Sequence, residues 1–254
     1  MSRVLGVIPA RIGSSRLPRK PLQPLLGKPL VLWVWERARR MRFLDRLVVA
    51  TDSEEVAEVC RGAGAETLLT SASHPTGSDR TWEVARHLGR GYDVIVNIQG
   101  DEPLVGADAV KAAISMVERG FDAGTCAAPV RDEEEFRDPA VVKVVRTSEG
   151  RALYFSRAAI PYGYGGTGEQ PRRHPDQQLR HVGVYAYRPE ALGRWVGLSR
   201  SPLELQEGLE QLRALEDGMR IGVALVAEAA EGVDTPHDLE RMESRLRSGG
   251  ATEA

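Results

Sequence analysis

Short apolar runs alternate with amphipathic helical stretches along the first half of the chain. Residues 4–8 form an apolar run that stops at Pro9, and residues 30–38 then place apolar side chains at helical spacing before a cluster of arginines. This alternation continues to residue 129, and it predicts an α/β fold with a parallel sheet and right-handed crossovers. We expect strands at 4–8, 47–50, 66–69, 94–98 and 124–129, and helices at 30–38, 54–63, 81–88 and 107–119.

The pattern changes from residue 131 onward. Residues 161–178 are rich in Gly, Pro, Tyr and Gln and form the longest irregular segment, and long loops of this kind are often lids or interface elements. No internal repeat or linker cuts the chain. We therefore expect one domain at 1–247, with about 131–205 as a subdomain or insertion and 248–254 as a frayed tail. In this half we expect strands at 141–145, 152–155, 181–187 and 221–227, a helix near 207–216 and a last helix that ends near Arg247.

Composition and charge narrow the class of protein. The 254 residues are enough for a substantial core, and the formal net charge of -2 provides no global basic field, so we expect no nucleic-acid partner. No apolar run reaches membrane-spanning length and the N-terminus has no signal-peptide core, so we expect no membrane partner. The only two cysteines, Cys60 and Cys126, lie far apart in the sequence, which favours a reduced, cytoplasmic setting.

A cationic loop follows the first expected strand. This first loop, residues 10–20, is built from small, hydroxyl and positively charged residues and leads into the helix at 30–38. Backbone N–H groups, hydroxyls and fixed positive charge together suit a polyphosphate, although a solvated surface loop fits the same spacing. The residues concerned are Arg11, Gly13, Ser14, Ser15, Arg16, Arg19 and Lys20.

Two more loops are expected at the same edge of the sheet, because the carboxyl ends of parallel strands lie together. In the loop after residue 69, Gly77 allows close backbone approach and Arg80 could reach an anion, while the alternative is a turn with Ser78 or Asp79 as helix N-cap. The expected central strand ends in Gln99-Gly100-Asp101-Glu102. Carboxylates there, beside a cationic loop, suit a divalent metal that bridges to phosphates, and a turn with solvated acids is the alternative.

Seven segments, in order and at suitable spacing, resemble the 3-deoxy-manno-octulosonate (Kdo) cytidylyltransferase family. They are IPARIGSSRLPRKPL, NIQGDEPL, VKVV, ALYFSRAAIPY, RHVGVYAYR, SPLELQEGLEQLRAL and GVDTPHDLERM, and they extend from Val4 to about Met242. The resemblance implies a Rossmann-like three-layer nucleotidyltransferase fold with a mostly parallel sheet, an inserted dimerisation and sugar-binding subdomain, and a homodimer. It also implies the reaction of CTP with Kdo to give CMP-Kdo and diphosphate, with Mg²⁺, for lipopolysaccharide biosynthesis.

The resemblance assigns roles to particular residues. Arg11 and Lys20 would hold the triphosphate, while Asp101 and Asp234 would hold the metal, and these four form the expected catalytic set. The expected nucleotide-binding residues are Ala10, Arg11, Gly13, Ser14, Ser15, Arg16, Lys20, Thr76, Gly77, Arg80, Gln99 and Gly100. The expected sugar-binding residues are Gln99, Arg157, His181, Tyr185, Glu210 and Gln211.

Some of the expected sugar-binding residues could have purely structural roles instead. His181 and Tyr185 lie four residues apart and share one face of a strand, so both could be core residues, and Glu210 and Gln211 could be solvated helix positions. The first loop also departs from the family, because many relatives have glycine where this chain has Arg19. The role of Arg19, the general base and the number of metal ions stay undecided.

Three other functions compete with the Kdo interpretation. A cytidylyltransferase for another acidic sugar, 8-amino-Kdo or a sialic acid, would share the first loop and differ in the sugar pocket. A nucleotide-sugar glycosyltransferase would also end a central strand in acids, but the acids here lack an acid-x-acid spacing. A non-catalytic nucleotide-binding regulator would be expected to lose the charged set, which is present in full.

Overall fold

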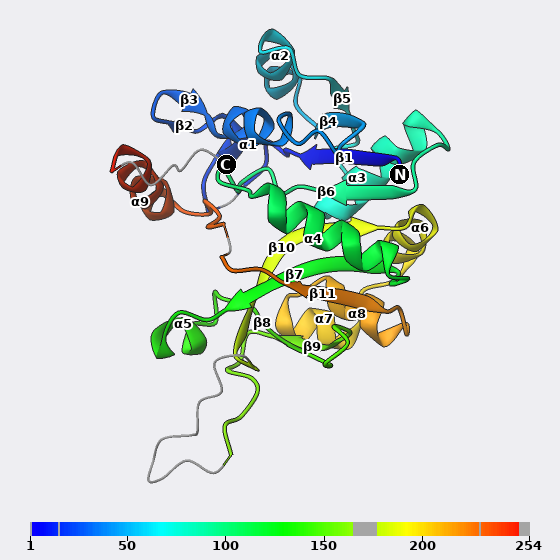
Figure 1. The fold of residues 1–254 in the computed structure, drawn as a ribbon. Coiled ribbons are helices and arrows are strands. Elements are labelled where there is room, and N and C mark those ends of the chain that lie inside the picture. Colours follow the sequence, from blue (N-terminus) through cyan, green and yellow to red (C-terminus); the bar gives the residue numbers. More distant parts are fainter. Residues whose placement is uncertain (1, 15, 165–176, 229, 249–254) are drawn as a thin grey trace. The chain divides into compact units, whose positions relative to one another are not determined.

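The computed structural model describes residues 2–14, 16–164, 177–228 and 230–248, and these residues fall into two compact units. Unit 1 combines the first 110 residues with the C-terminal segment from residue 230, and unit 2 comprises residues 111–229 (Figure 1). The C-terminal segment of the chain thus completes the unit that the N-terminal segment begins. The expected frayed tail lies almost entirely outside the described residues.

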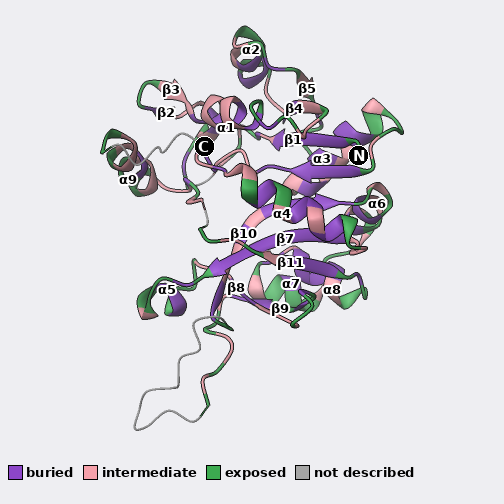
Figure 2. Cartoon of the chain, viewed as in Figure 1, coloured by how far each residue is buried: buried purple, intermediate pink, exposed green. Residues whose placement is uncertain are grey.

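The sheet of unit 1 is parallel, as its sequence pattern predicts. The four strands lie in the order β6-β1-β4-β5, and both neighbours of β1 run in its direction. Almost every side chain of β1 and β6 is buried (Figure 2), because helices cover a sheet of this kind on both faces and its strands become apolar throughout. The strands are β1 Val4–Pro9, β4 Arg46–Thr51, β5 Thr67–Leu69 and β6 Val94–Asn97.

The second and third helices of unit 1 begin at side-chain caps, whereas the first follows Pro29, which makes no side-chain capping hydrogen bond. The Ser53 side chain accepts a hydrogen bond from the Val56 N–H, so Ser53 caps the second helix. The third helix begins earlier than expected, because Thr76 is its N-cap and forms a capping box with Asp79; the expectation of a cap at Ser78 or Asp79 was therefore wrong. These helices are α1 Leu30–Ala38, α2 Glu54–Gly62 and α3 Gly77–Leu88, and α4 Ala107–Glu118 leads into unit 2.

The C-terminal helix is attached to the region of the first loop by an apolar cluster. Helix α9, Pro236–Arg247, follows a segment in which Val233 is fully buried. Val233 packs in one cluster with Leu17, Leu25, Leu30 and Met242. These contacts bring the end of the chain to the small hairpin of β2 Pro24–Leu25 and β3 Lys28–Pro29, which follows the 3-10 helix η1, Lys20–Leu22.

Unit 2 has a mixed sheet. Strand β7 pairs in parallel with β11 and antiparallel with β10, which also pairs with the β8–β9 hairpin. The expected helix near 207–216 is divided into α7 and α8 at Gly208, which adopts a left-handed conformation, and the pattern missed helix α6 altogether. The strands are β7 Ala123–Pro129, β8 Lys143–Arg146, β9 Ala152–Ser156, β10 Leu179–Tyr187 and β11 Ile221–Leu225, and the helices are α5 Glu133–Arg137, α6 Pro189–Gly197, α7 Pro202–Glu207 and α8 Gln211–Glu216.

None of the helices in the described part of the chain combines the length and the apolarity needed to cross a bilayer. Both cysteines are buried and neither forms a disulfide.

Candidate active site

Unit 1 has a pocket of about 420 Å³ at the carboxyl edge of its parallel strands. The first loop, the start of α3, the end of β6 and the segment before α9 all contribute to it. Of the twelve residues expected to bind nucleotide, ten line the pocket; Gly13 is not part of its lining, and Ser15 lies outside the described residues. The lining comprises Pro9, Ala10, Arg11, Ser14, Arg16, Lys20, Pro21, Pro75, Thr76, Gly77, Arg80, Gln99, Gly100, Asp101 and Asp234.

Two glycines allow these segments to converge on the end of β1. A Cβ atom on Gly100 would lie 2.5 Å from the carbonyl oxygen of Pro9, a distance that no side chain tolerates. A Cβ atom on Gly77 would lie 3.2 Å from the Pro9 ring. Gly100 therefore brings the Gln99–Asp101 turn directly against the first loop, which is the close approach that the sequence predicted only for Gly77.

Most of the described backbone donors of the first loop are unpaired within the protein. Between Arg11 and Arg16, the only described N–H group that makes a hydrogen bond is that of Ile12, which donates to Asp52 Oδ1 at 2.9 Å. Unpaired amides next to cationic side chains form an anion-binding surface. The geometry therefore agrees with a phosphate-binding role for this loop.

Lys20 lies between the two carboxylates that the resemblance assigned to a metal. Its Nζ atom is 2.5 Å from Asp101 Oδ2 and 2.8 Å from Asp234 Oδ1, and Arg16 lies 3.2 Å from the other oxygen of Asp234. Burial alone would lower the pKa of Lys20, but the charges and hydrogen bonds of Asp101 and Asp234 outweigh it and raise the pKa. The Val233 N–H donates to the Asp101 carbonyl at 2.9 Å, which fixes Asp234 beside Asp101 in spite of their separation in sequence.

The same two carboxylates fit Mg²⁺. This ion is commonly bound by one or two protein carboxylates, with substrate phosphates and water as its other ligands. The described residues contain no group of three or more His, Cys, Asp and Glu side chains that could hold a metal without a substrate. Asp101 and Asp234 meet at one cation, the ammonium of Lys20, so they already form a common site for positive charge.

The neighbouring acid, Glu102, lies in a different environment. It is buried at 8% exposure, and its Oε2 atom has no hydrogen-bond partner among the described residues. Burial, with a smaller contribution from the charge of Asp101, raises the pKa of Glu102 to about 8. Of the two acids that end the central strand, only Asp101 lines the pocket.

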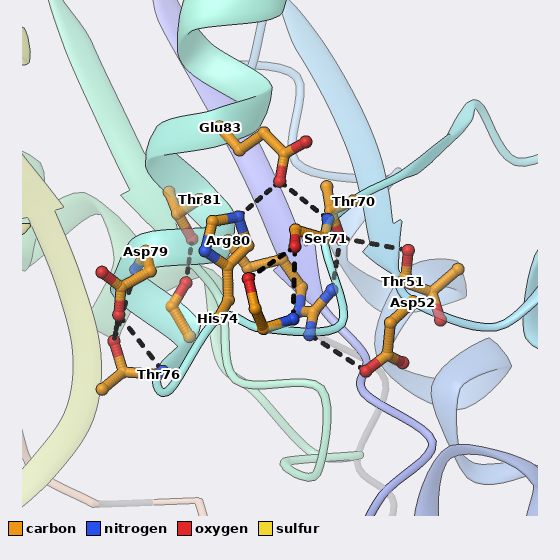
Figure 3. Close-up of polar contacts among 12 residues, drawn as sticks. Thr51, Asp52, Thr70, Ser71, His74, Thr76, Asp79, Arg80, Thr81 and Glu83 are labelled. Carbon is orange, nitrogen blue, oxygen red and sulfur yellow. Dashed lines mark hydrogen bonds and ion pairs between the residues drawn. The ribbon is translucent and has the colours of Figure 1, made fainter.

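Arg80 lines the pocket but is itself buried, at 2% exposure. Its guanidinium donates to the hydroxyl of Thr70 and pairs with Asp52 at 3.2 Å (Figure 3). The expected contact between Arg80 and a nucleotide therefore stays a prediction, and its charge is already compensated within the protein.

The expected sugar-binding residues, apart from Gln99 in unit 1, belong to unit 2. Arg157 donates from Nε to the Glu207 carbonyl and from Nη1 to the Pro139 carbonyl, both at 2.8 Å. The rings of His181 and Tyr185 lie 5.3 Å apart, as expected for residues on one face of β10. The hydroxyl of Tyr185 is buried without a hydrogen-bond partner among the described residues.

The remaining two lie at the start of α8. Glu210 Oε1 accepts a hydrogen bond from the indole of Trp195 at 2.7 Å, and Gln211 is buried at 7% exposure. Neither is the solvated helix position that the sequence left as an alternative.

Comparisons with known proteins identify the family. A family model described as "Cytidylyltransferase" matches residues 5–221. The 3-deoxy-manno-octulosonate cytidylyltransferase of Azorhizobium caulinodans is 47% identical over 254 residues, covering 97% of each chain, and that of Syntrophotalea carbinolica is 44% identical over 96% of this chain and 98% of the relative. The chain belongs to the 3-deoxy-manno-octulosonate cytidylyltransferase family.

The comparison with solved structures agrees with the family that the sequence relatives show. The structure of CMP:2-keto-3-deoxy-manno-octonic acid synthetase complexed with CTP has a TM-score of 0.88 and 35% identity, and the match covers 98% of this chain and 100% of that one. A 4-diphosphocytidyl-2C-methyl-D-erythritol synthase from Anaerococcus prevotii, with a TM-score of 0.64 and 12% identity, shares the fold alone. The expected Rossmann-like nucleotidyltransferase fold is thus confirmed.

Sequence reasoning missed two carboxylates that support this cytidylyltransferase site. Asp52 was not among the expected site residues, yet its side chain binds the first loop at Ile12. Glu207 was seen only as the start of a helix, yet it accepts hydrogen bonds from the Ser156 hydroxyl at 2.6 Å and the Arg157 N–H at 2.9 Å. The available signal for Asp52 was its place directly after a strand that ends at the ligand-binding edge.

Proposed function

We propose that this chain joins CTP to Kdo and releases diphosphate, giving CMP-Kdo. The chain belongs to this family, and one observation carries the proposal. The first loop, which includes Lys20, lies in one pocket with Asp101 and Asp234. A polyphosphate needs fixed cations and free N–H donors, and a carboxylate pair can hold the metal that accompanies it.

In the proposed reaction, the anomeric hydroxyl of the sugar attacks the α-phosphorus of CTP in line. A bond forms from this oxygen to phosphorus while the bond between the α-phosphorus and the bridging oxygen breaks, and diphosphate leaves. Negative charge develops on the phosphate oxygens, so Arg11 and Lys20 would stabilise the transition state more than the ground state. The residue that accepts the hydroxyl proton is not assigned.

Asp101 and Asp234 are the residues that would hold Mg²⁺. Bound there, the ion would supply positive charge at the α-phosphate. Lys20 would then exchange its carboxylate partners for phosphate oxygens. Before the exchange, the charges and hydrogen bonds of Asp101 and Asp234 outweigh burial and raise the pKa of Lys20, so its ammonium is charged when the nucleotide binds.

Residues of unit 2 would recognise the sugar. Arg157 suits the carboxylate of Kdo, because guanidinium and carboxylate form charge-assisted hydrogen bonds. The hydroxyl of Tyr185 is buried and has no hydrogen-bond partner among the described residues, so it suits a sugar hydroxyl that would satisfy it. Both features also fit 8-amino-Kdo or a sialic acid, which remain the alternative substrates.

The assembly and cellular context are further parts of the proposal. Tyr162 and Tyr164, at the start of the irregular segment 161–178, are 81% and 90% exposed, which supports the expected homodimer interface there. Residues 165–176 of that segment lie outside the described residues. We place the reaction in the cytoplasm, where CTP is available, and its product in lipopolysaccharide biosynthesis.

A diphosphate-release assay tests the proposal. Purified protein with CTP and Mg²⁺ should release diphosphate with Kdo, and should release much less with 8-amino-Kdo or a sialic acid. Activity with one of these alternatives and none with Kdo would retain the cytidylyl transfer and exclude Kdo as the substrate.

The variant Asp101→Asn tests the assignment of the site. It should lower kcat by roughly a hundredfold or more, because it removes a metal ligand and a partner of Lys20 together. Asp93→Asn, at the opposite end of the same strand, is the matched control and should retain near-normal activity, since the Asp93 side chain accepts a backbone hydrogen bond from Arg3 and does not line the pocket. Near-normal turnover of Asp101→Asn would exclude Asp101 from the metal site.

A further inference from the structure

The first loop is attached to the neighbouring strand through one side chain. Asp52 follows β4 directly, and its Oδ1 atom accepts the N–H of Ile12 at 2.9 Å. Ile12 is flanked by Arg11, which lines the pocket, and by Gly13. At the start of the loop, the Ala10 N–H donates to the Ala50 carbonyl at 2.8 Å, which continues the pairing of β1 with β4. Beyond that point, the strand pairing ends and Asp52 alone holds the loop backbone as far as Arg16, among the described residues.

Asp52 is itself held by a buried charge. Its second oxygen, Oδ2, lies 3.2 Å from Nη2 of Arg80, and the side chains are 11% and 2% exposed. The other terminal nitrogen of Arg80 donates to the Thr70 hydroxyl. The same hydroxyl donates to the Thr51 carbonyl at 3.0 Å (Figure 3). A buried pair of this kind is strongly oriented, because moving either partner leaves an uncompensated charge.

We propose that Asp52 is a positioning residue for the first loop and that Arg80 acts through Asp52 instead of contacting the nucleotide. Arg80 fixes the Asp52 carboxylate, and the carboxylate fixes Ile12, so that Arg11 and the unpaired amides beside it are held in place for the triphosphate. The inference rests on the proposed CTP site. It assigns the fixed conformation of the first loop to Asp52, a residue that the resemblance does not name and that does not line the pocket.

Arg80 lines the pocket, but its burial and its existing partners favour a role through Asp52 over a nucleotide contact. A guanidinium that binds phosphate must present its N–H groups to the ligand, and Arg80 is only 2% exposed. Its two terminal nitrogens are both engaged, with Thr70 and Asp52. Removal of Asp52 would therefore act on the loop, whereas in a nucleotide-contact model it would leave Arg80 unpaired and better able to bind phosphate.

The test uses diphosphate release with Asp52→Asn, Arg80→Gln and the double variant. Ile12 and Arg80 bind different oxygens of Asp52, and an amide has an acceptor at only one of these two positions, so in this geometry it cannot accept from both. The KM for CTP should rise about tenfold in Asp52→Asn, the scale of one hydrogen bond to a charged group, with a smaller change in kcat. The double variant should recover part of this loss, because an amide can accept from Ile12 while it donates to a second amide.

Coupling to Arg11 separates positioning from a general structural effect. In an Arg11→Ala background, Asp52→Asn should have clearly less than its tenfold effect on the KM for CTP, because the side chain that it positions is already absent. Glu54→Gln is the matched control and should change KM less than twofold, since Glu54 makes only an exposed ion pair with Arg61. Thermal unfolding of each variant shows whether it is folded. If Asp52→Asn is unstable, the double variant keeps the test valid, because it removes one negative and one positive charge and leaves no buried charge unpaired at this pair.

Two results would overturn the proposal. One is a normal KM in Asp52→Asn together with a large rise in Arg80→Gln, which would make Arg80 a nucleotide contact. The other is a double variant that is worse than either single variant. Inactivity of the unmodified protein with CTP and every sugar acid would instead contradict the proposed function, so the two failures are distinguishable.

Discussion

Arg19 adopts a left-handed backbone conformation, with φ 55° and ψ 36°, directly before Lys20. Residues with a Cβ atom are disfavoured there by about 1 kcal/mol or more, which accounts physically for the glycine that many relatives have at this position. Its guanidinium pairs with Glu55 in the first turn of α2. Both groups are more than half exposed, so this pair contributes at most about 1 kcal/mol and does not remove the backbone strain.

The backbone strain can be measured with two substitutions at this position. Arg19→Gly and Arg19→Ala both remove the pair with Glu55, and only the glycine variant also removes the strain. Arg19→Gly should therefore be more stable than Arg19→Ala by about 1 kcal/mol in urea unfolding. Equal stability of the two variants would show that this turn does not keep its left-handed conformation in solution.

Burial keeps the imidazole of His181 neutral well below the ordinary pKa of histidine. Desolvation lowers its pKa to about 3, below the ordinary value of 6.5, and Nε2 lies 2.9 Å from the hydroxyl of Thr125. The unfolded chain therefore takes up a proton near pH 6.5 that the folded chain does not accept until about pH 3. The stability contributed by neutral His181 is present above pH 6.5 and is lost as pH falls between these values.

This linkage predicts a pH-dependent difference between the wild type and His181→Gln. Relative to the variant, the wild type should lose up to about 1.4 kcal/mol of unfolding free energy per pH unit below pH 6.5, and the difference should be constant above pH 7. Urea unfolding at pH 5, 6, 7 and 8 measures it. A difference that does not change with pH would show that His181 is solvated and titrates normally.

The types of the site residues could be predicted from the sequence, but their pairing could not. The strand-loop order placed Lys20, Asp101 and the start of α3 at one edge, and the structure brings them together. Lys20 binds both carboxylates because backbone contacts, such as the hydrogen bond from Val233 to Asp101, bring the two acids together. The pattern of residues along the sequence does not indicate such contacts. The burial of Arg80 likewise depends on Asp52 and Thr70, each in a different segment.

At the scale of elements, α7 and α8 form a corner that is fixed by a buried ion pair. Glu204 on α7 accepts two hydrogen bonds of 2.6 Å from Arg213 on α8, and the two side chains are only 4% and 5% exposed. Burial alone would raise the pKa of Glu204, but Arg213 and Arg200 outweigh it and lower the pKa. The corner orients the start of α8, which carries Glu210 and Gln211.

Glu204→Gln should be among the most destabilising acid-to-amide changes in unit 2. It removes the carboxylate that accepts two hydrogen bonds from the buried guanidinium of Arg213, and breaking a buried ion pair in this way typically costs about 3–5 kcal/mol of unfolding free energy. The double change Glu204→Met with Arg213→Leu should recover much of that loss. Glu36→Gln is the control, because Glu36 pairs with Lys28 at a half-exposed site, and urea unfolding should show a change below about 1 kcal/mol.

Strands were easier to predict than short helices. All the expected strands are present because apolar runs bounded by polar residues have few alternatives in a buried sheet. Helix α6 begins at Pro189 and is only partly apolar, so its pattern did not stand out from the loop around it. Helix α3 begins with Thr76, Gly77 and Ser78, which are equally typical of a turn, and only its capping box distinguishes the two.

At the scale of the molecule, unit 1 is discontinuous in sequence. It consists of the residues before 111 and those after 229, and the cluster around Val233 joins its two parts. The sequence predicted one domain with an insertion at about 131–205, and this prediction remains untested. Hydrophobic periodicity shows where elements begin and end, but it does not show which distant segments pack together.

Removal of the C-terminal segment should abolish activity. A chain that ends at Ala229 lacks Asp234 and exposes Leu17, Leu25 and Leu30 of the apolar cluster. We expect no measurable diphosphate release and a clear loss of thermal stability. A chain that ends at Ser248 is the matched control and should keep wild-type turnover, and activity of the shorter chain would exclude Asp234 from the reaction.

The discontinuity of unit 1 also has a consequence for biosynthesis. A ribosome completes all of unit 2 before it adds the residues that supply Asp234, a delay on the order of ten seconds at ordinary elongation rates. During that time the nascent N-terminal part holds Lys20 and Asp101 but cannot assemble the second carboxylate beside them. If Asp234 acts as proposed, prematurely terminated chains lack the second carboxylate of the site, and only translation products that extend beyond residue 234 can be active.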